Sequence, residues 1–440
     1  MAKPVGAICN LECAYCYFLS KEQLFPGSSF RMSRETLERY VREYLAAQPP
    51  GEVTFAWQGG EPTLLGLDFF EAAVALQRQH CPPGRRVVNT IQTNGTKLDD
   101  DWCRFLRRHD FLVGISIDGP RALHDAYRVD KAGAGSFERV MAGLTALRRY
   151  GVEYNVLTTV HAANQHAPLQ VYRFLRDEAG ARFMQFIPIV ERAPGNGSGS
   201  CPSADGPAAA GAVTARSVDA AAYGAFMSSV FDEWVRRDVG RVFVQLFDVT
   251  LGAYAGAPGG LCIFDETCGG ALALEHTGDV YACDHFVEPA HHLGNLSERP
   301  LAELAADPRQ RAFGLAKRDT LPRACRECEV RWLCHGGCPK DRIGSAPDGE
   351  DGLNYLCEGY RRFFTHSAPL MRFMARELRE RRAPANVMRH LAEAARTTAA
   401  VSGTADDARC AAVGTGRAAS RNAPCPCGSG RKVKHCCGRR

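Results

Sequence analysis

Three cysteines lie within eight residues near the start of the chain, Cys9, Cys13 and Cys16 in CNLECAYC, and the first histidine is His80. Three thiolates in one short loop can hold three irons of a cubane iron–sulfur cluster and leave the fourth iron open to another ligand. A closed structural zinc site needs a fourth Cys or His, so a zinc ion completed by a distant residue is the alternative. The spacing favours the open cluster, and an open iron indicates chemistry.

The composition is that of an ordinary globular protein, with 45% hydrophobic and 23% charged residues among 440, a length that suggests about three domains. The formal net charge of +5 is small, so charge alone argues for neither nucleic acid nor a membrane surface as a partner. No run of about 18 apolar residues occurs, and MAKPVGAIC is too short for the apolar core of a signal peptide. We therefore expect a cytoplasmic protein.

The 19 cysteines are grouped at tight spacings in a long chain without an export signal, which favours metal ligation over disulfides. Four of them fall outside the groups and receive no role, because most lone buried cysteines are simply small hydrophobes. These four are Cys81, Cys103, Cys201 and Cys410.

The first half alternates short β-rich runs with amphipathic helical patterns such as SRETLERYVREYL. Ser33, Asp100 and Ser136 are suitable N-caps for three of the helices. Six βα repeats predict an α/β fold with a parallel sheet, which on curling forms a partial (β/α)6 barrel with its active face at the carboxyl ends of the strands. The expected strands are Lys3–Ile8, Val53–Trp57, Val87–Thr93, Leu112–Ile117, Tyr154–Val160 and Phe183–Val190.

Residues 193–216 are rich in Gly, Ala, Ser and Pro and lack periodicity, so they are expected to form a loop or disordered insertion. A helical pattern resumes near Ser217 and runs to about Arg237.

Polar and glycine residues follow the predicted strands and should converge on one mouth. Gln58-Gly59-Gly60-Glu61-Pro62 follows the second strand, where two glycines permit close backbone approach to a ligand and their carbonyls can accept hydrogen bonds from an ammonium group. Read alone, the same residues are a turn. Ser116 in the fourth strand can equally be a satisfied core hydroxyl, and Arg128 a solvated charge.

The second half contains eight cysteines between residues 262 and 357, the number needed for two fully ligated cubanes. Two structural zinc ions are the alternative, which spacing alone leaves open. The eight are Cys262, Cys268, Cys283, Cys325, Cys328, Cys334, Cys338 and Cys357.

The C-terminal end reads as a linker followed by a small metal-binding motif. Residues 383–420 are rich in Ala and Arg, with one possible short helix from Pro384 to Thr397. Beyond them, four thiolates and His435 occupy a span too short for its own core, so a metal must supply the folding energy. Four ligands close the shell of a structural Zn²⁺. The thiolates are Cys425, Cys427, Cys436 and Cys437.

These motifs together resemble a known family. CxxxCxxC followed by Tyr17 resembles the radical S-adenosylmethionine (SAM) enzymes, and the Gly-Gly-Glu-Pro after a strand resembles their GGEP motif. CRECEVRWLCHGGC, with Cys357 and the upstream trio, resembles the SPASM extension, which carries two auxiliary [4Fe–4S] clusters. With AKPVGAICNLECAYCYFLSKE, FAWQGGEPTLLGLDFF, QTNGTKLDDDWCRFL and ISIDGPRALHDAYRVDKAG, the chain from about residue 2 to about 378 resembles the anaerobic sulfatase-maturating enzymes. The tail resembles the SEC-C zinc module.

The resemblance implies four domains: a radical SAM partial barrel at 1–240, a SPASM domain at 241–382, a linker at 383–420 and a SEC-C-like zinc motif at 421–440. It implies three [4Fe–4S] clusters and SAM as cofactors. The open iron would chelate SAM, and an electron from the cluster would break the sulfonium to give a 5′-deoxyadenosyl radical. By the same resemblance, Gly59, Gly60 and Glu61 contact the SAM amino group, Ser116 reaches the ribose, and Arg128 lies near the carboxylate side or the substrate.

Further implied roles concern the substrate and the auxiliary clusters. Gln58 matches a position that contacts the substrate peptide. Asp284 matches the proposed base, whose pKa a desolvated pocket could raise toward the working range. The alternative for Asp284 is an aspartate that orients the cluster loop or pairs with His285. Family ligation assigns the cysteines in two interleaved sets, Cys262, Cys268, Cys283 and Cys338 in one and Cys325, Cys328, Cys334 and Cys357 in the other.

Phe18 departs from the family pattern, because relatives can carry there a tyrosine that hydrogen-bonds to the substrate. If the loop is built alike, the neighbouring Tyr17 points elsewhere. The resemblance therefore does not imply a hydroxyl contact to the substrate.

The resemblance implies oxidation of a cysteine or serine, within CxPxR or SxPxR of a sulfatase precursor, to Cα-formylglycine by hydrogen abstraction from Cβ. It also implies an electron donor such as flavodoxin or ferredoxin, and a protein partner for the tail. Two alternatives stay open: a maturase that crosslinks or forms a thioether in another ribosomal peptide, and a zinc-rich binding protein without catalysis. Neither a membrane nor a nucleic acid is expected as a partner.

Overall fold

The computed structural model describes residues 1–193, 213–257, 259–397 and 431–432. Its main sheet places β1 to β7 side by side in chain order and all parallel, as the βα repeats predict. The order ends at β7, so the barrel is partial and open. These strands are β1 (Ala2–Lys3), β2 (Glu52–Trp57), β3 (Arg86–Thr93), β4 (Leu112–Ser116), β5 (Tyr154–Val160), β6 (Phe183–Pro188) and β7 (Phe243–Val244).

The alternation of side chains explains why these segments are strands. In β2, Val53, Phe55 and Trp57 are buried on one face, whereas Glu52 and Thr54 are exposed. The first strand is shorter than predicted, because the chain turns after Lys3, where the Gly6 N–H donates to the Lys3 carbonyl at 3.0 Å. Residues 4 to 8, expected to continue the strand, therefore form the loop that leads into the first cysteine motif.

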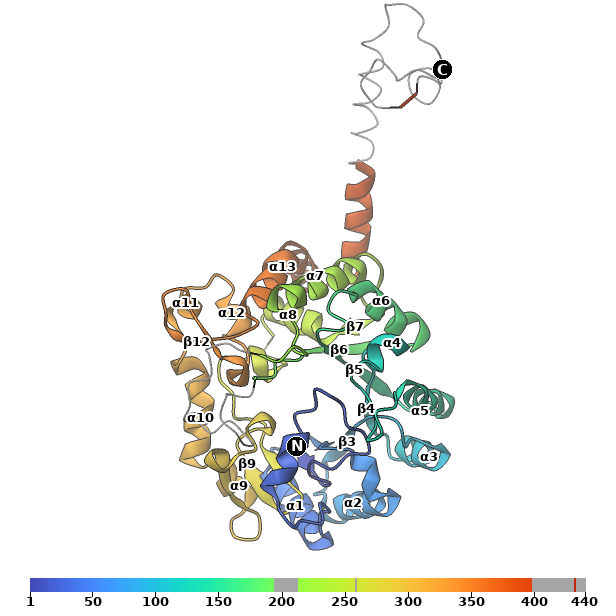
Figure 1. Ribbon diagram of the computed structural model, residues 1–440, viewed down its shortest axis with the longest axis vertical. Coiled ribbons are helices and arrows are strands. Elements are labelled where there is room, and N and C mark those ends of the chain that lie inside the picture. The colour runs from blue at the N-terminus through green and yellow to red at the C-terminus, as the bar shows by residue number, and fades with distance from the viewer. Residues whose placement is uncertain (194–212, 258, 398–430, 433–440) are drawn as a thin grey trace, which may run out of the picture.

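Helices cover the outer side of the curved sheet, and Figure 1 shows α2, α3, α5 and α6 along it. In α1, the buried Leu37, Tyr40, Val41 and Leu45 fall on a single stripe at helical spacing. The helices of this half are α1 (Arg34–Ala47), α2 (Leu67–His80), α3 (Asp100–Arg108), α4 (Arg121–His124), α5 (Phe137–Tyr150), α6 (Pro168–Arg173) and α7 (Ala220–Arg237).

The predicted N-caps have three different outcomes. The Ser33 hydroxyl accepts from the Thr36 N–H and caps α1 as predicted. The prediction of Asp100 is wrong by one residue, because Asp99 caps α3. Ser136 occupies the cap position of α5, but its hydroxyl donates to the Arg128 carbonyl, and Asp125 accepts the Phe137 N–H instead.

The second half extends the same sheet from its other edge. β8 (Ala273–Glu275) pairs in parallel with β1, and β9 (Asp279–Tyr281) and β10 (His292–Asn295) follow as antiparallel neighbours. The two predicted domains on either side of residue 240 therefore share one sheet, and their division at that residue stays a prediction. Smaller elements complete this half: α8 (Gln245–Ala255), α9 (Leu301–Ala305), α10 (Pro308–Asp319), α11 (Arg323–Arg326), α12 (Arg331–Cys334), β11 (Gly344–Ser345) and β12 (Asp351–Leu353).

The long helix α13 (Cys357–Arg379) packs against α7 and α8 and closes the body of the molecule. A further helix at 386–397, where a short helix was predicted, follows it and projects outward (Figure 1). Val387 at its start is fully buried. The predicted loop at 193–216 and the four cysteines of the C-terminal motif fall mostly or wholly outside the described residues. Among the helices that are described, none is long and apolar enough to cross a membrane.

Candidate active site

The loop that carries Cys9, Cys13 and Cys16 follows β1 and lies over the carboxyl ends of the strands. It is held in place by backbone bonds to the segment after α4: Glu12 N–H donates to Val129 at 2.8 Å, and Ala14 N–H donates to Tyr127 at 2.9 Å. Cys13 is buried, and the other two cysteines are half-buried. The sequence interval of 9 to 16 is thus folded back as one compact thiol-bearing loop.

The three thiols are close enough to affect one another's ionisation. Burial, Glu61 and then the other two thiols raise the pKa of Cys9 to about 12, and burial raises that of Cys13 to about 11. Bound cationic iron would reverse these shifts and hold the thiolates, so the donor set fits an iron–sulfur cluster. In the described part of the chain, no three metal-binding side chains converge closely enough for one metal ion. A cubane spreads its thiolates more widely, because its irons and sulfides lie between them.

The Gly59–Gly60 turn packs against the loop that leads to Cys9. The Gly60 N–H donates to the Gly6 carbonyl at 2.8 Å, and a Cβ at Gly60 would lie 2.0 Å from the Ile8 carbonyl oxygen. Gly59 has φ +119°, a conformation that side chains rarely adopt. Glycine is required here because the turn comes close to the protein's own backbone. The sequence predicted a close approach to a ligand instead.

Glu61 anchors the same turn through its carboxylate. One oxygen accepts from the Thr63 N–H, the Thr63 hydroxyl and the Thr93 hydroxyl, and the other accepts from the Asn94 N–H at 2.7 Å. The side chain is fully buried, and burial raises its pKa. This carboxylate ties the loop after β2 to the loop after β3, which is a positioning role; the predicted contact of Glu61 with SAM would have to come through its backbone.

Arg128 is buried behind the cluster loop. Its guanidinium donates to the Tyr15 hydroxyl at 2.7 Å, and Tyr15 donates in turn to Asp118 at 2.5 Å. The solvated alternative for Arg128 is therefore wrong. Its Nε is buried without a hydrogen-bond partner among the described residues, so it can still serve an acceptor such as a bound carboxylate. Ser116 lies at the end of β4, with 9% of its surface exposed.

Asp284 lies directly after Cys283 in the sequence and reaches the first strand. Its carboxylate forms an ion pair with the fully buried Lys3 of β1 and accepts a hydrogen bond from the Tyr17 hydroxyl at 2.5 Å. Lys21 donates to its backbone carbonyl at 2.6 Å. A residue of the second half is thus fixed at the mouth formed by the first half.

The pKa of Asp284 is shifted in the direction opposite to the prediction. Burial alone would raise its pKa, but Lys3, His285 and Lys21 outweigh burial and hold the pKa well below the ordinary range. The carboxylate is therefore ionised at neutral pH and ready to accept a proton, although it is a weaker base than predicted. Its ion-pair partner is Lys3, and His285 acts on it electrostatically, so the predicted alternative of an aspartate that orients the cluster loop or pairs with His285 stays a prediction.

Tyr17, Phe18 and Gln58 line the same region. The Tyr17 ring stacks on Phe18 with centroids 4.2 Å apart and is 42% exposed, while its hydroxyl is on Asp284. The expectation that Tyr17 points elsewhere is wrong, because the hydroxyl that Phe18 lacks is supplied at the site by the preceding residue, Tyr17. Gln58 is half-buried beside β1, and its N–H donates to the Ala2 carbonyl at 2.9 Å.

The structure gathers the eight cysteines of the second half into two neighbourhoods. Besides the dominant effect of burial, Cys262 and Cys268 raise the pKa of Cys283, and Cys283 contributes to that of Cys338. In the other neighbourhood, burial raises the pKa of Cys334 to about 12 with help from Cys357, Cys325 and Cys328. These neighbourhoods are the same two interleaved sets that the family resemblance implies.

Two cations lie among these thiols, the buried Lys317 and the half-buried Arg342. The Lys317 ammonium donates to the backbone carbonyls of Cys262, Ile263 and Asp265. Arg342 interacts electrostatically with Cys325, Cys334 and Cys338, and its Nη1 is buried without a partner in the described residues. Thiolate-ligated clusters are anionic, so positive charge here fits two auxiliary clusters.

Sequence reasoning missed Lys3, Tyr17, Lys317 and Arg342 as parts of the site. Only Tyr17 belongs to a motif, and the contacts of Lys3, Tyr17 and Lys317 join residues that are far apart in the sequence. The sequence held a signal only for Lys3, because a lysine is unusual in a strand that is predicted to belong to a buried parallel sheet.

Three family descriptions match the chain. Residues 4–175 match the radical SAM superfamily, residues 262–329 match an iron–sulfur cluster-binding domain named SPASM, and residues 421–439 match the SEC-C motif. The first two matches show that the chain carries domains for iron–sulfur clusters and SAM. They support iron over the zinc alternative for the cysteines of both halves.

Full-length relatives agree with these matches. A serine-type anaerobic sulfatase-maturating enzyme of Bacteroides thetaiotaomicron is 44% identical over 89% of this chain and 94% of its own length. A cysteine-type enzyme of Clostridium perfringens is 32% identical over 84% of this chain and 96% of its own length.

A solved structure described as native anSMEcpe with bound AdoMet superposes with a TM-score of 0.74 at 31% identity, covering 85% of this chain and 98% of the other. A second, with bound AdoMet and the Kp18Cys peptide, also gives 0.74, covering 86% of this chain and 98% of the other. The motifs, the open parallel barrel and these relatives agree, and the chain belongs to the anaerobic sulfatase-maturating enzymes of the radical SAM superfamily.

Proposed function

We propose that this protein oxidises a serine or cysteine of a sulfatase precursor, within SxPxR or CxPxR, to Cα-formylglycine. The observation that carries the proposal is Asp284, which the SPASM half places beside the cluster loop through Lys3 and Tyr17. A base at that position can take the proton of a hydroxyl or thiol whose Cβ hydrogen has been removed. The serine-type relative has the higher identity of the two compared, so a serine peptide is the first substrate to test.

The cofactors fit the first half as follows. Cys9, Cys13 and Cys16 would hold one [4Fe–4S] cluster with an open iron. When bound, this cluster and SAM supply a 5′-deoxyadenosyl radical that removes the hydrogen atom. Backbone carbonyls of Gly59 and Gly60 would receive the SAM amino group. Ser116 and Arg128 would hold the ribose and the carboxylate side, a role for which the unpartnered Arg128 Nε is suited.

The chain's own residues then position the peptide and move its proton. Gln58 offers an amide at the barrel mouth for a backbone group of the peptide. Asp284 is ionised and can accept the proton of the target hydroxyl or thiol, while Lys3 balances its charge. A carboxylate has about four acceptor positions, so Tyr17 and the substrate can bond to it together.

The auxiliary clusters follow the two thiol neighbourhoods. Cys262, Cys268, Cys283 and Cys338 would hold one cluster, and Cys325, Cys328, Cys334 and Cys357 the other. The electrostatic contacts within each set support this division. Asp284 follows Cys283, so the auxiliary cluster of the Cys262 set would lie nearest to the substrate and would receive the second electron of the oxidation. With a cysteine target, water would hydrolyse the resulting thioaldehyde to the aldehyde and release sulfide.

Three further assignments complete the proposal. An electron donor such as flavodoxin or ferredoxin would reduce the cluster held by Cys9, Cys13 and Cys16. A Zn²⁺ bound by Cys425, Cys427, Cys436 and Cys437 would fold the C-terminal motif, which matches SEC-C and would recruit a protein partner. We place the protein in the cytoplasm.

The deciding experiment is anaerobic incubation of the iron-loaded protein with SAM, dithionite and an SxPxR peptide, with a CxPxR peptide in parallel. The expected product carries an aldehyde that a hydrazide reagent labels. A control peptide with alanine at the target position should stay unlabelled. A crosslinked or thioether product would instead identify a maturase of another peptide class, and iron far below about twelve per chain would contradict three cubanes.

A further inference from the structure

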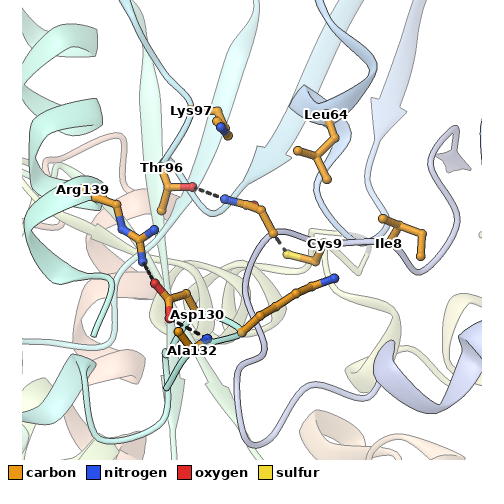
Figure 2. A pocket seen from close by; sticks show the side chains of 10 residues that line it. Ile8, Cys9, Leu64, Thr96, Lys97, Asp130, Ala132 and Arg139 are labelled. Carbon is orange, nitrogen blue, oxygen red and sulfur yellow. Dashed lines mark hydrogen bonds and ion pairs between the residues drawn. The ribbon is translucent and has the colours of Figure 1, made fainter. Parts of the chain in front are cut away.

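A pocket with a volume of about 630 Å³ lies beside the cluster loop. Figure 2 shows Ile8 and Cys9 of that loop on one side, Thr96 and Lys97 after β3, and Asp130 with Arg139 on the other side. The pocket is open to solvent, and the sulfur of a cluster ligand forms part of its wall.

Cys9 is the ligand at this opening. Its sulfur accepts from the Leu11 N–H at 3.3 Å and from the Asn94 side chain at 3.5 Å, so it is fixed at the pocket. Cys13, by contrast, is buried against the protein, next to Tyr15 and Arg128. Electron transfer weakens steeply with distance, so the half-buried Cys9 at this pocket offers a short route from solvent to the cluster.

The rim of this pocket is positively charged. Lys97, Lys131 and Arg139 are exposed along it, and Asp130 is its one lining carboxylate. Asp130 is already committed to the Ala132 N–H at 3.0 Å and to Arg139 at 2.8 Å. Neither lysine has an ion-pair partner within the described residues, which leaves two uncompensated cations at the edge of the pocket.

The pocket is separate from the mouth that receives SAM and the peptide. Its lining excludes Gln58, Ser116, Arg128 and Asp284. A molecule seated here would therefore reach the cluster without displacing either the cosubstrate or the peptide.

We propose that this cationic rim is the docking surface for a small acidic one-electron carrier protein of the flavodoxin class. The carrier's flavin hydroquinone would give one electron and become a semiquinone, and the [4Fe–4S]²⁺ cluster behind Cys9 would become [4Fe–4S]¹⁺. The inference rests on the proposed function, because it assumes that Cys9 ligates this cluster. Opposite charge on the carrier would raise the association rate and orient the flavin toward Cys9.

The test measures the rate at which reduced flavodoxin reduces the first cluster of the complete, iron-loaded protein, followed by electron paramagnetic resonance after rapid freezing. The double variant Lys97→Glu/Lys131→Glu should slow this step about tenfold at low ionic strength. Reduction by dithionite, which needs no docking, should be unchanged. Added salt should lower the rate at which flavodoxin reduces the original protein, and it should decrease the difference in this rate between the original protein and the variant.

A matched control carries the same change of charge on α13, which packs on α7 and α8: Arg372→Glu/Arg379→Glu should leave the rate unchanged. Equal rates for the rim variant and the original protein, or equal slowing by the control, would overturn the proposal. If the rim variant loses iron, the neutral variant Lys97→Gln/Lys131→Gln replaces it. This variant should slow reduction of the cluster by flavodoxin to a smaller extent, and an unchanged rate would contradict the proposal. Aldehyde formation with dithionite tests the proposed function separately, since it does not involve the carrier.

Discussion

Asp284 is the residue through which the second half of the chain meets the cluster loop. Replacement by asparagine keeps the shape but removes the charge that Lys3 balances and the capacity to take a proton. We expect Asp284→Asn to lower aldehyde formation at least about 100-fold. Formation of 5′-deoxyadenosine should persist, because the cluster loop and the SAM contacts are intact. The two products are measured together by chromatography.

Asp279→Asn is the matched control for this variant, since Asp279 lies five residues earlier and bonds to Thr277, His292 and Asn295. It should leave the ratio of aldehyde to 5′-deoxyadenosine unchanged. Full aldehyde formation by Asp284→Asn would exclude this residue as the base.

Tyr17 is expected to act through Asp284. Its hydroxyl bonds to the carboxylate at 2.5 Å, and loss of that bond frees the carboxylate to shift away from the substrate. Tyr17→Phe should lower kcat about fivefold to tenfold, the effect of one charge-assisted hydrogen bond, and leave KM for the peptide nearly unchanged. Steady-state kinetics with the serine peptide measures both constants.

A double-variant cycle separates this role from a structural one. Tyr17→Phe should add little to the loss caused by Asp284→Asn, because both act through the same group. Tyr44→Phe removes a hydroxyl that bonds to the Thr54 carbonyl at 3.0 Å and serves as the control. Fully additive losses from Tyr17 and Asp284 would contradict the coupling.

The residues that carry a motif could be predicted from sequence, and those that act across the fold could not. Cys9, Cys13 and Cys16 are defined by spacing, which the chain shows directly. Lys3 and Asp284 are 281 positions apart and meet only because β8 pairs with β1. Tyr17 and Phe18 are adjacent, so which ring reaches the mouth depends on the tertiary path of the loop.

At the scale of elements, the turn after β2 supports the cluster loop through a contact that leaves no room for a side chain. Gly60→Ala would place a methyl group 2.0 Å from the Ile8 carbonyl oxygen, which is backbone and cannot rotate away. We expect a loss of about 3 kcal/mol of stability and of about four irons per chain, because the loop of Cys9 must shift. Thermal unfolding and iron analysis measure the two effects.

Gly252→Ala is the control for that substitution. Gly252 lies inside α8, where an added Cβ meets only the Ala257 Cβ at 3.7 Å. Alanine should stabilise this helix slightly and leave the iron content unchanged. Normal iron content in Gly60→Ala would show that the turn does not support the cluster loop.

Glu377 joins α13 to the helix at 386–397. Its carboxylate accepts from Arg382 at 2.9 Å and from the Asn386 side chain at 2.6 Å, and these bonds lower its pKa to about 2 from an ordinary 4.5. A carboxyl group whose pKa is lower in the folded form than in the unfolded form stabilises the fold at pH values above its unfolded pKa. This stabilisation is lost as the pH falls toward the folded pKa. Glu377→Gln should therefore weaken hydrogen-exchange protection at 386–397 at pH 7.

The difference in hydrogen-exchange protection at 386–397 between the original protein and Glu377→Gln should decrease once the pH falls below about 4.5. Exchange rates corrected for their intrinsic pH dependence measure this trend, with the exposed Glu393→Gln of the same helix as a neutral control. A difference that stays constant down to pH 3 would assign the effect of Glu377 to its shape and not to its charge.

Most strands could be predicted because their alternating burial is written in local sequence, and β5 has the predicted bounds. The errors arose where local signals compete. Asp99 and Asp100 are equally suitable as N-caps, and the helix begins at Asp100, so that Asp99 occupies the cap position. The first strand was predicted too long, because Val5 and Ile8 are apolar but the turn at Gly6 takes them out of the ladder.

At the scale of the whole molecule, the helix at 386–397 precedes the C-terminal motif in the sequence. The start of that helix is part of the body, since Val387 is fully buried and Phe373 stacks on His390 at 4.6 Å. A truncation that tests the tail must therefore begin at residue 398, not at 383 as the sequence alone would place it. Removal of 398–440 should leave the iron content near twelve per chain and eliminate about one zinc ion.

Turnover distinguishes the roles of the two parts. The truncated protein should oxidise a short SxPxR peptide at the original rate, because Asp284 and the cluster loop lie in the body. It should oxidise and bind the full-length sulfatase precursor more weakly if the motif recruits that protein, and Cys425→Ser/Cys427→Ser in the complete chain should reproduce the defect by removing two zinc ligands. Unchanged binding and turnover of the full-length substrate would rule out recruitment of the precursor. Slower oxidation of the short peptide would instead mean that the motif contributes to the active site itself.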